Sequence, residues 1–229
     1  MWLELLYPGR CLLCGTELLF AGTDREPVCG ACRGRLAPLA VAGRCCVCSL
    51  PLISEQGRCT RCREREYDFG RNVSACEYRW PVKELLFQYK FRNRRRLAPL
   101  LADLLAPLLQ TEYPGRLLVP APANPRGVRR RGWDPVELLA RSLQERHGAQ
   151  IHPCLRRRAG APQKSLSYEE RLENLRRQVW PLAGRVPARP LVLLDDVFTT
   201  GATANECARV LLGGGALAVD ILTLAIDVP

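Results

Sequence analysis

The residues with the clearest chemical use form one run near the carboxyl end of the chain, LVLLDDVFTTGATANE at Leu191–Glu206. Its first four residues are continuously apolar, which is typical of a central strand in a parallel sheet. Asp195 and Asp196 follow at the carboxyl end of that strand, which is the end where open α/β sheets bind their ligands. A turn that leads into a helix comes next, and it comprises Thr199, Thr200, Gly201, Ala202 and Thr203.

This turn has the groups of an anion-binding site. Free backbone N–H groups, hydroxyls and the positive end of the helix dipole meet at one point, and Gly201 lets the backbone approach a phosphate closely. The two carboxylates can accept hydrogen bonds from vicinal ribose hydroxyls. The alternative is an ordinary N-capped helix after a strand, but the complete run is much more specific than that pattern. The run therefore predicts a pocket for a ribose 5-phosphate.

Eight cysteines near the amino end form four Cys-x2-Cys pairs. Each pair can place two thiolates on one tetrahedral ion, so consecutive pairs predict two structural zinc sites in which the protein fills all four positions. A thioredoxin-like redox role for one pair is the alternative, and four repeated pairs argue against it. The predicted ligands are Cys11, Cys14, Cys29 and Cys32 for the first site, and Cys45, Cys48, Cys59 and Cys62 for the second.

The composition is that of a globular chain with a basic surface. The chain has 229 residues, of which 47% are hydrophobic, and this suits one ordinary domain with a small one attached. The net charge is +11, and all but three of the 34 basic residues are arginines, whose planar forks fit phosphate oxygens. Genomic base bias produces the same enrichment, so the charge suggests polyanionic partners without proving any.

Targeting and redox signals favour the cytoplasm. No stretch approaches the roughly 18 apolar residues of a membrane span, and the first residues lack the basic and apolar regions of a signal peptide. Nine of the twelve cysteines lie before residue 63, and cysteines grouped in this way in a cytoplasmic chain favour metal binding over disulfides. We therefore expect a cytoplasmic protein without membrane insertion.

Two domains are expected. Residues 1–66 are rich in Cys, Gly and Arg and have too little apolar surface to fold without metal. Residues 67–229 alternate strand and helix signals, which indicates an α/β domain with a mostly parallel central sheet flanked by helices. The expected strands are Val73–Tyr78, Arg116–Val119, one near Gln150–Leu155, Leu191–Leu194 and Ala216–Ala225. The expected helices are Val82–Phe91, Leu97–Leu109, Pro135–Arg146 and one from about Thr203 to Leu212.

Two loops complete the predicted site. The Pro- and Arg-rich loop after the expected strand Arg116–Val119 can present backbone N–H groups and Arg126 to a pyrophosphate, with Mg²⁺ bridging its oxygens. The segment Arg156–Glu170 has no periodic apolar face and is expected to be a mobile lid. Lys164 in this lid is either a ligand of the same pyrophosphate or a solvated loop charge.

These features together resemble the ComF family of competence proteins, over nearly the whole chain. The run Leu191–Glu206 resembles the phosphoribosyl pyrophosphate (PRPP) motif of type I phosphoribosyltransferases. Val119–Trp133 resembles the family's Val-Pro-x-Pro loop, and Gln163-x2-Leu166-x4-Arg171-x2-Asn174 resembles its flexible-loop signature. The family usually continues the Arg-Gly-aromatic motif with Asn-Gln, whereas this sequence continues with Asp134 and Pro135.

The resemblance implies a type I phosphoribosyltransferase fold behind a double zinc ribbon. It places Asp195 and Asp196 against the ribose and the turn Thr199–Thr203 on the 5-phosphate of PRPP, which binds with Mg²⁺. It also implies handling of incoming single-stranded DNA in the cytoplasm during natural transformation, beside a helicase-type protein partner.

Arginine clusters support a polyanionic partner, although each one alone is also consistent with a solvated face. They are Arg92–Arg96, Arg126–Arg131 and Arg156–Arg158, with Tyr89, Phe91 and Trp133 as neighbouring aromatic residues that can stack on bases.

Two enzymatic readings stay open beside DNA handling. One is ribose transfer from PRPP with Asp195, Asp196 and Lys164 as catalytic residues, and the other is nucleobase salvage without any role in DNA uptake. The residues permit such chemistry, but no segment identifies an acceptor.

Overall fold

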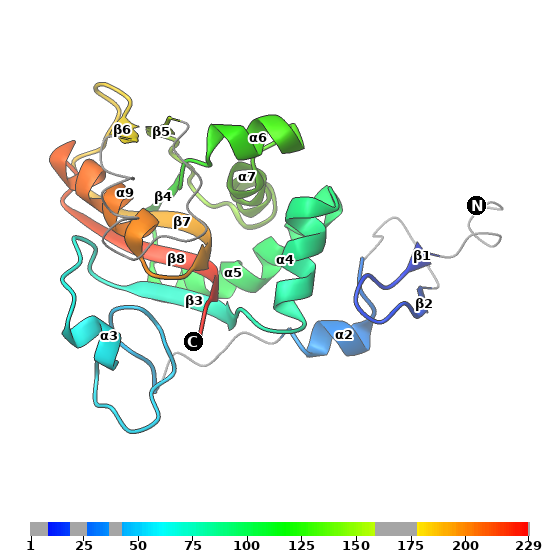
Figure 1. Ribbon diagram of the computed structural model, residues 1–229. Helices are drawn as coiled ribbons and strands as arrows, with labels where there is room; N and C mark the ends of the chain where they lie inside the picture. The colour runs from blue at the N-terminus through cyan, green and yellow to red at the C-terminus, as the bar shows by residue number, and fades with distance from the viewer. Residues whose placement is uncertain (1–8, 19–26, 37–42, 159–177, 229) are drawn as a thin grey trace.

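The structure is a computed structural model that describes residues 9–18, 27–36, 43–158 and 178–228. In Figure 1 a central sheet lies among helices, and the two cysteine-rich segments occupy different places around it. The first carries β1 (Gly9–Arg10), β2 (Glu17–Leu18) and α2 (Gly30–Gly34) and lies beyond α4, whereas the second carries α3 (Thr60–Arg63) and lies beside β3. Within the described ranges, no helix has both the length and the apolarity that a membrane span needs.

Four parallel strands form the central sheet in the order β3-β8-β7-β4. Their bounds are Asn72–Glu77 for β3, Leu117–Pro120 for β4, Pro190–Phe198 for β7 and Ala218–Ile226 for β8. A single parallel bridge between Leu118 and Ile151 extends the sheet beyond β4. This pairing confirms the predicted α/β class with a mostly parallel sheet.

Helices cover both faces of the sheet, which explains why β7 begins as an unbroken apolar run. Alternate side chains of a strand point to opposite faces, so Val192 and Leu194 join the core with α4, α5 and α7, whereas Leu191 and Leu193 join the core with α9. The helices are α4 (Val82–Phe91), α5 (Ala98–Glu112), α6 (Pro125–Arg131), α7 (Pro135–His147) and α9 (Ala202–Gly213), with a 3-10 turn at Arg95–Leu97.

The loop expected after β4 contains a short helix that the prediction missed. Asn124 caps α6, because its Oδ1 accepts a hydrogen bond from the Arg126 N–H at 3.0 Å. Pro125 occupies the first helical position, where a missing N–H costs nothing. The left-handed Gly132, at φ 77°, ends the helix. Local capping residues therefore outweigh the loop-like composition of this segment.

The strand expected near Gln150–Leu155 is also different. Only Ile151 bridges to the sheet, and Pro153 lacks the N–H that a continuing inner strand would donate. The chain instead forms β5 (Leu155–Arg157), which pairs antiparallel with β6 (Val179–Pro181) in a separate two-stranded sheet. The first residues of the predicted lid thus belong to β5, and its remainder from residue 159 lies outside the described residues.

Candidate functional site

The site lies at the carboxyl ends of β4 and β7, two neighbouring strands after which the chain continues to opposite sides of the sheet. The chain leaves β4 toward α6, α7 and Ile151 at one side of the sheet, and leaves β7 toward α9 and β8 at the other. Such a switch in strand order opens a crevice outside the carboxyl ends of the two strands. A hollow of about 280 Å³ occupies this position. We call it the strand-end hollow, and its lining includes Lys90, Arg131, Arg157, Asp195, Asp196 and Thr203.

The two acids lie at the edge of this hollow because β7 is longer than β4. The β4 pairing ends at Pro120 and Leu194, whereas β7 continues beside β8 to Phe198. Asp195 and Asp196 therefore lie inside β7 rather than after it, and project past the last residue of β4. The structure brings both predicted acids to the hollow.

Lys90, which was not predicted as a site residue, lies beside these two acids. The Nζ atom of Lys90, in the last turn of α4, lies 2.6 Å from Oδ2 of Asp196, and the two side chains are only 20% and 17% exposed. Burial of this kind strengthens the attraction relative to a surface pair. The one available signal was the scarcity of lysine in an arginine-rich chain, because nothing local links Lys90 to a residue 106 positions later.

Asp195 is held in an environment that favours its protonated form. Burial and the neighbouring Asp196 carboxylate raise the pKa of Asp195 to about 7, and the opposite charges of Lys90 and Arg157 counteract this only in part. Its Oδ1 accepts a hydrogen bond from the Asp196 N–H at 2.8 Å. Burial also lowers the pKa of Arg157, whose Nε has no hydrogen-bond partner among the described residues. The hollow thus holds a partly buried cation and a titratable acid.

The predicted phosphate turn has a left-handed glycine at its centre. Gly201 has φ 82° and precedes α9 directly, so the first N–H groups of that helix face the turn. A Cβ atom on Gly201 would lie 2.8 Å from the Phe198 ring and 3.0 Å from the Tyr67 ring. No side chain can therefore be added here without moving aromatic rings. Thr203 reaches the hollow, while Thr199 is exposed on the turn itself.

Several predicted ligands do not line the hollow, since Thr203 is the one residue of the turn Thr199–Thr203 in its lining. Arg126 is exposed in the first turn of α6 and does not line the hollow, whereas Arg131 and Arg157 do. Its role as a pyrophosphate ligand stays a prediction. Lys164 and the flexible-loop signature lie outside the described residues, so the structure does not test them.

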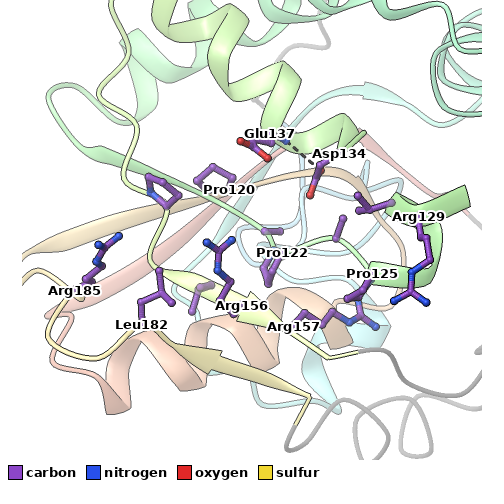
Figure 2. A pocket seen from close by; sticks show the side chains of 15 residues that line it. Pro120, Pro122, Pro125, Arg129, Asp134, Glu137, Arg156, Arg157, Leu182 and Arg185 are labelled. Atoms are coloured by element: carbon purple, nitrogen blue, oxygen red, sulfur yellow. Dashed lines mark hydrogen bonds between the residues drawn. The ribbon is translucent and has the colours of Figure 1, made fainter. Parts of the chain in front are cut away.

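A second hollow of about 580 Å³ lies beside the first, and Figure 2 shows its lining. The two hollows share the β4–α6 loop and Arg157. Apolar side chains, among them Pro120 and Leu182, line this space together with the arginines, and Asp134 and Glu137 lie at the start of α7. We call it the arginine hollow after Arg129, Arg156, Arg157 and Arg185. Its two acids are already engaged, since Asp134 caps α7 and Glu137 lies 2.6 Å from an Nη atom of Arg141.

Both predicted cysteine clusters form. In each, the four Sγ atoms lie within 4.8 Å of one another. The Cys14 and Cys29 sulfurs are 3.6 Å apart, as are those of Cys48 and Cys59. Four thiolates about 2.3 Å from a tetrahedral zinc ion lie roughly 3.8 Å apart, so both clusters fit zinc. Cys46 belongs to neither cluster.

The second cluster is joined to the sheet and to the phosphate turn. Asn72 in β3 donates from Nδ2 to the Cys48 carbonyl at 2.9 Å. Arg61, which lies between the last two cysteines of the cluster, donates from Nη1 to the Thr199 carbonyl at 2.8 Å. The Tyr67 hydroxyl donates to the Thr200 carbonyl at 3.3 Å. Two consecutive carbonyls of the turn therefore accept hydrogen bonds from side chains that lie in, or just after, the second cysteine-rich segment.

The aromatic residues predicted to stack on bases are only partly accessible. Tyr89 and Trp133 are 1% and 8% exposed, and their ring centroids lie 4.9 Å apart in an edge-to-face contact. The Tyr89 hydroxyl donates to the Pro135 carbonyl at 2.7 Å. The prediction that these two rings stack on bases is therefore wrong, because Tyr89 lies on the buried face of α4 and Trp133, between α6 and α7, packs against it in the core. Phe91 is 55% exposed and remains accessible.

Two cysteine clusters that fit zinc, followed by a parallel α/β domain with an acidic strand end and a phosphate-type turn, define a double zinc ribbon joined to a phosphoribosyltransferase-type domain. The family described as "Double zinc ribbon domain" matches residues 2–63. The "DNA utilization protein YhgH" of Escherichia coli K12 is 32% identical over 230 residues, which cover 96% of this chain and 98% of that protein. The chain belongs to the ComF family.

Two further similarities are more distant. "Competence protein ComFC" of Bacillus subtilis is 28% identical over 233 residues, covering 93% of each chain. An adenine phosphoribosyltransferase structure from Thermoanaerobacter pseudethanolicus is 19% identical with a TM-score of 0.36, and the match covers 62% of this chain and 84% of that one. This last similarity is weak.

Proposed function

We propose that the chain binds PRPP, or its ribose 5-phosphate part, with Mg²⁺ in the strand-end hollow, and that it handles single-stranded DNA during DNA uptake in natural transformation. The observation that carries the proposal is the meeting of Asp195 and Asp196 with the phosphate turn at the switch between β4 and β7. The names of the relatives in Escherichia coli and Bacillus subtilis, which refer to DNA utilization and competence, support the proposed role in DNA uptake.

The contacts to PRPP follow from the hollow's chemistry. Asp195 and Asp196 accept hydrogen bonds from the two ribose hydroxyls, and the turn Thr199–Thr203 donates backbone N–H groups to the 5-phosphate. Arg131 and Arg157 provide positive charge along the same lining for the pyrophosphate. Lys90 balances the acids until a ligand binds.

Magnesium fits this arrangement as a companion of the ligand. The described residues offer no cluster of three or more acids, histidines or cysteines other than the two cysteine clusters. Mg²⁺ commonly binds through one or two carboxylates together with substrate phosphates and water, and Asp195 and Asp196 are the carboxylates present. When bound, Mg²⁺ would neutralise charge on the pyrophosphate.

The wider role rests on charge and on family. A net charge of +11, carried mainly by arginine, favours a polyanionic partner. We further propose a cytoplasmic location, a helicase-type protein partner, and domains that comprise residues 1–66 and 67–229. The hydrogen bond from Arg61 to the Thr199 carbonyl supports a direct contact between these two proposed domains.

Ribose transfer is the second candidate function, and the arginine hollow favours it. A transferase needs an acceptor beside the ribose, and this hollow is adjacent to the strand-end hollow through Arg157. With four arginines and both acids already engaged, it would select an anionic acceptor. Asp195, Asp196 and Lys164 are the proposed catalytic residues, and an oxocarbenium-like transition state would be stabilised mainly by charge and positioning.

Calorimetric titration with Mg²⁺–PRPP tests the first half of the proposal. Asp196→Asn is expected to weaken binding about ten- to a hundredfold, because a hydrogen bond to a charged acceptor contributes about 1.5–3 kcal/mol. Glu145→Gln, on the exposed side of α7, is the matched control and should bind as the native chain does. Absence of PRPP binding by the native chain would reject the ribose site.

Binding of single-stranded DNA, with and without Mg²⁺–PRPP, tests the second half. DNA handling predicts binding that weakens steeply with salt and survives the Asp195→Asn/Asp196→Asn double substitution. A transferase predicts pyrophosphate release from PRPP with an anionic acceptor, lost in Asp196→Asn. A salvage enzyme predicts transfer to a free nucleobase and no salt-dependent strand binding.

A further inference from the structure

The solvent-facing side of α4 carries aromatic rings. Phe87 and Phe91 are 42% and 55% exposed, and Trp80, just before the helix, is 53% exposed. In the described part of the chain, these are the aromatic side chains with the greatest exposure, and all three belong to one short segment. Exposed apolar groups gathered in this way mark interaction sites rather than packing.

The helix geometry places Phe87 and Phe91 on one stripe. Lys83, Phe87 and Phe91 follow each other at intervals of four residues, so their side chains are neighbours on the helix surface. The opposite face, with Val82, Leu85, Leu86 and Tyr89, is buried against the core. The ring centroids of Phe87 and Phe91 lie 5.5 Å apart with an interplanar angle of 37°.

Cations accompany the rings. The guanidinium carbon of Arg92 lies 5.7 Å from the Phe87 ring centroid, and that of Arg35, in the first cysteine-rich segment, lies 5.4 Å from the Trp80 ring centroid. The arginines after α4 are all exposed. Of the nearby acids, Glu77 forms an ion pair with Arg79 at 2.8 Å, and Glu84 accepts a hydrogen bond from the neutral amide of Gln88 at 2.7 Å.

The stripe leads to the strand-end hollow. Phe91, its last ring, lines that hollow together with Lys90. Beyond the end of α4, Arg94, Arg95 and Arg96 line a further hollow of about 760 Å³ against the first cysteine-rich segment. The phosphates of a strand that follows these arginines would therefore pass both the first cysteine-rich segment and the strand-end hollow.

We infer that the exposed face of α4 with Phe87 and Phe91, flanked by Trp80 before the helix and Arg92 after it, is a stacking platform for the unpaired bases of a single DNA strand. The inference rests on the strand binding proposed above and assigns it a surface. Base stacking on aromatic rings is independent of sequence, and interleaved guanidinium groups suit the phosphates between the bases. A duplex keeps its bases stacked on one another, and an apolar protein partner would not match the interleaved arginines.

The platform is tested by comparing oligo-dT with an abasic strand of equal length and charge, using fluorescence anisotropy. The native chain should bind oligo-dT more tightly. The Phe87→Ala/Phe91→Ala double variant should bind oligo-dT at least about tenfold more weakly, with little change for the abasic strand, because each stacked base contributes about 1–3 kcal/mol. Leu217→Ala, which removes an apolar side chain that is 69% exposed elsewhere, should not change either affinity.

Two further variants separate stacking from apolarity and from misfolding. Phe87→Tyr/Phe91→Tyr should keep the preference for bases, whereas Phe87→Leu/Phe91→Leu should lose it. Zinc content and thermal unfolding of each variant show whether it is folded. A native chain that binds neither strand would reject the strand-binding function itself. A native chain that prefers oligo-dT, with a double alanine variant that keeps this preference, would reject the platform alone.

Discussion

The Nη1 atom of Arg61 lies 2.8 Å from the carbonyl oxygen of Thr199, so a side chain of the second cysteine cluster holds the backbone of the phosphate turn. The guanidinium also lies 5.9 Å from the Phe198 ring centroid, and the Tyr67 hydroxyl binds the next carbonyl of the turn. A carbonyl that points toward Arg61 is turned away from an anion. The second cysteine-rich segment therefore helps to fix the backbone of the turn that we propose as the phosphate site.

Removing Arg61 is expected to loosen the turn without emptying the zinc site. Arg61→Ala should weaken Mg²⁺–PRPP binding about tenfold, because a charged donor to a carbonyl contributes about 1.5–3 kcal/mol. Zinc content in the presence of excess zinc should stay unchanged, since Arg61 is not a ligand and only hydrogen-bonds the thiol of Cys48. Calorimetry and elemental analysis measure the two quantities. Arg63→Ala, whose Nε binds the Arg58 carbonyl within the same segment, is the control that should bind PRPP normally.

Gly201 is expected to tolerate no side chain. In Gly201→Ala, the left-handed backbone and the close Phe198 and Tyr67 rings should together cost about 1–3 kcal/mol of unfolding free energy and weaken PRPP binding. Gly213→Ala, at the other end of α9, meets no atom within 4 Å and should change stability by less than about 0.5 kcal/mol. Equal urea midpoints for the two variants would contradict this account of the turn.

Local spacing was sufficient to predict the parts of the site that lie close together in sequence. The cysteine pairs and the run from Asp195 to Thr203 are of this kind, and the structure gathers the cysteines into two clusters and places Asp195, Asp196 and Thr203 in one hollow. Lys90 and Arg61 escaped prediction because their partners lie more than a hundred residues away in sequence and only the tertiary fold brings them close. The burial of Tyr89 was not predicted either, because the sequence shows an aromatic residue near arginines but does not show which face of its helix is buried.

The cysteine clusters are expected to hold two zinc ions per chain with no contribution from Cys46. Cys48→Ser should remove one zinc and lower the unfolding free energy by several kcal/mol, because metal binding is coupled to folding. Cys46→Ser should leave both ions in place, since Cys46 belongs to neither cluster. Elemental analysis with thermal unfolding measures both effects. A native content well below two zinc ions would contradict the two-site arrangement.

The raised pKa of Asp195 makes stability depend on pH in a defined window. The folded carboxyl has a pKa of about 7 against an ordinary value of 3.8, so the folded chain binds this proton more tightly than the unfolded chain. The stability contributed by that proton is therefore fully present below about pH 4 and is lost as pH rises toward 7. Asp195→Asn does not titrate, so its unfolding free energy relative to the native chain should rise across this window by about 2–4 kcal/mol. Urea denaturation of both chains at several pH values measures the difference, and a flat difference would show that Asp195 titrates normally.

Lys90 is expected to influence the pH at which Asp195 loses its proton in the folded chain. Its charge lies 2.6 Å from Asp196 and favours the ionised form of Asp195 as well, so Lys90→Met leaves two neighbouring carboxylates with less compensation. The pH at which Asp195 loses its proton should then rise by about one unit, because a nearby opposite charge typically shifts a carboxyl by that amount or more. The same stability difference, measured between Lys90→Met and Lys90→Met/Asp195→Asn, should continue to grow above pH 7 instead of levelling off.

Lys83→Met, which removes an exposed lysine from the same helix, should leave the pH at which this difference levels off unchanged. If both lysine variants level off at the same pH, the Lys90–Asp196 pair has no influence on Asp195, and the acids must be balanced by Arg157 alone.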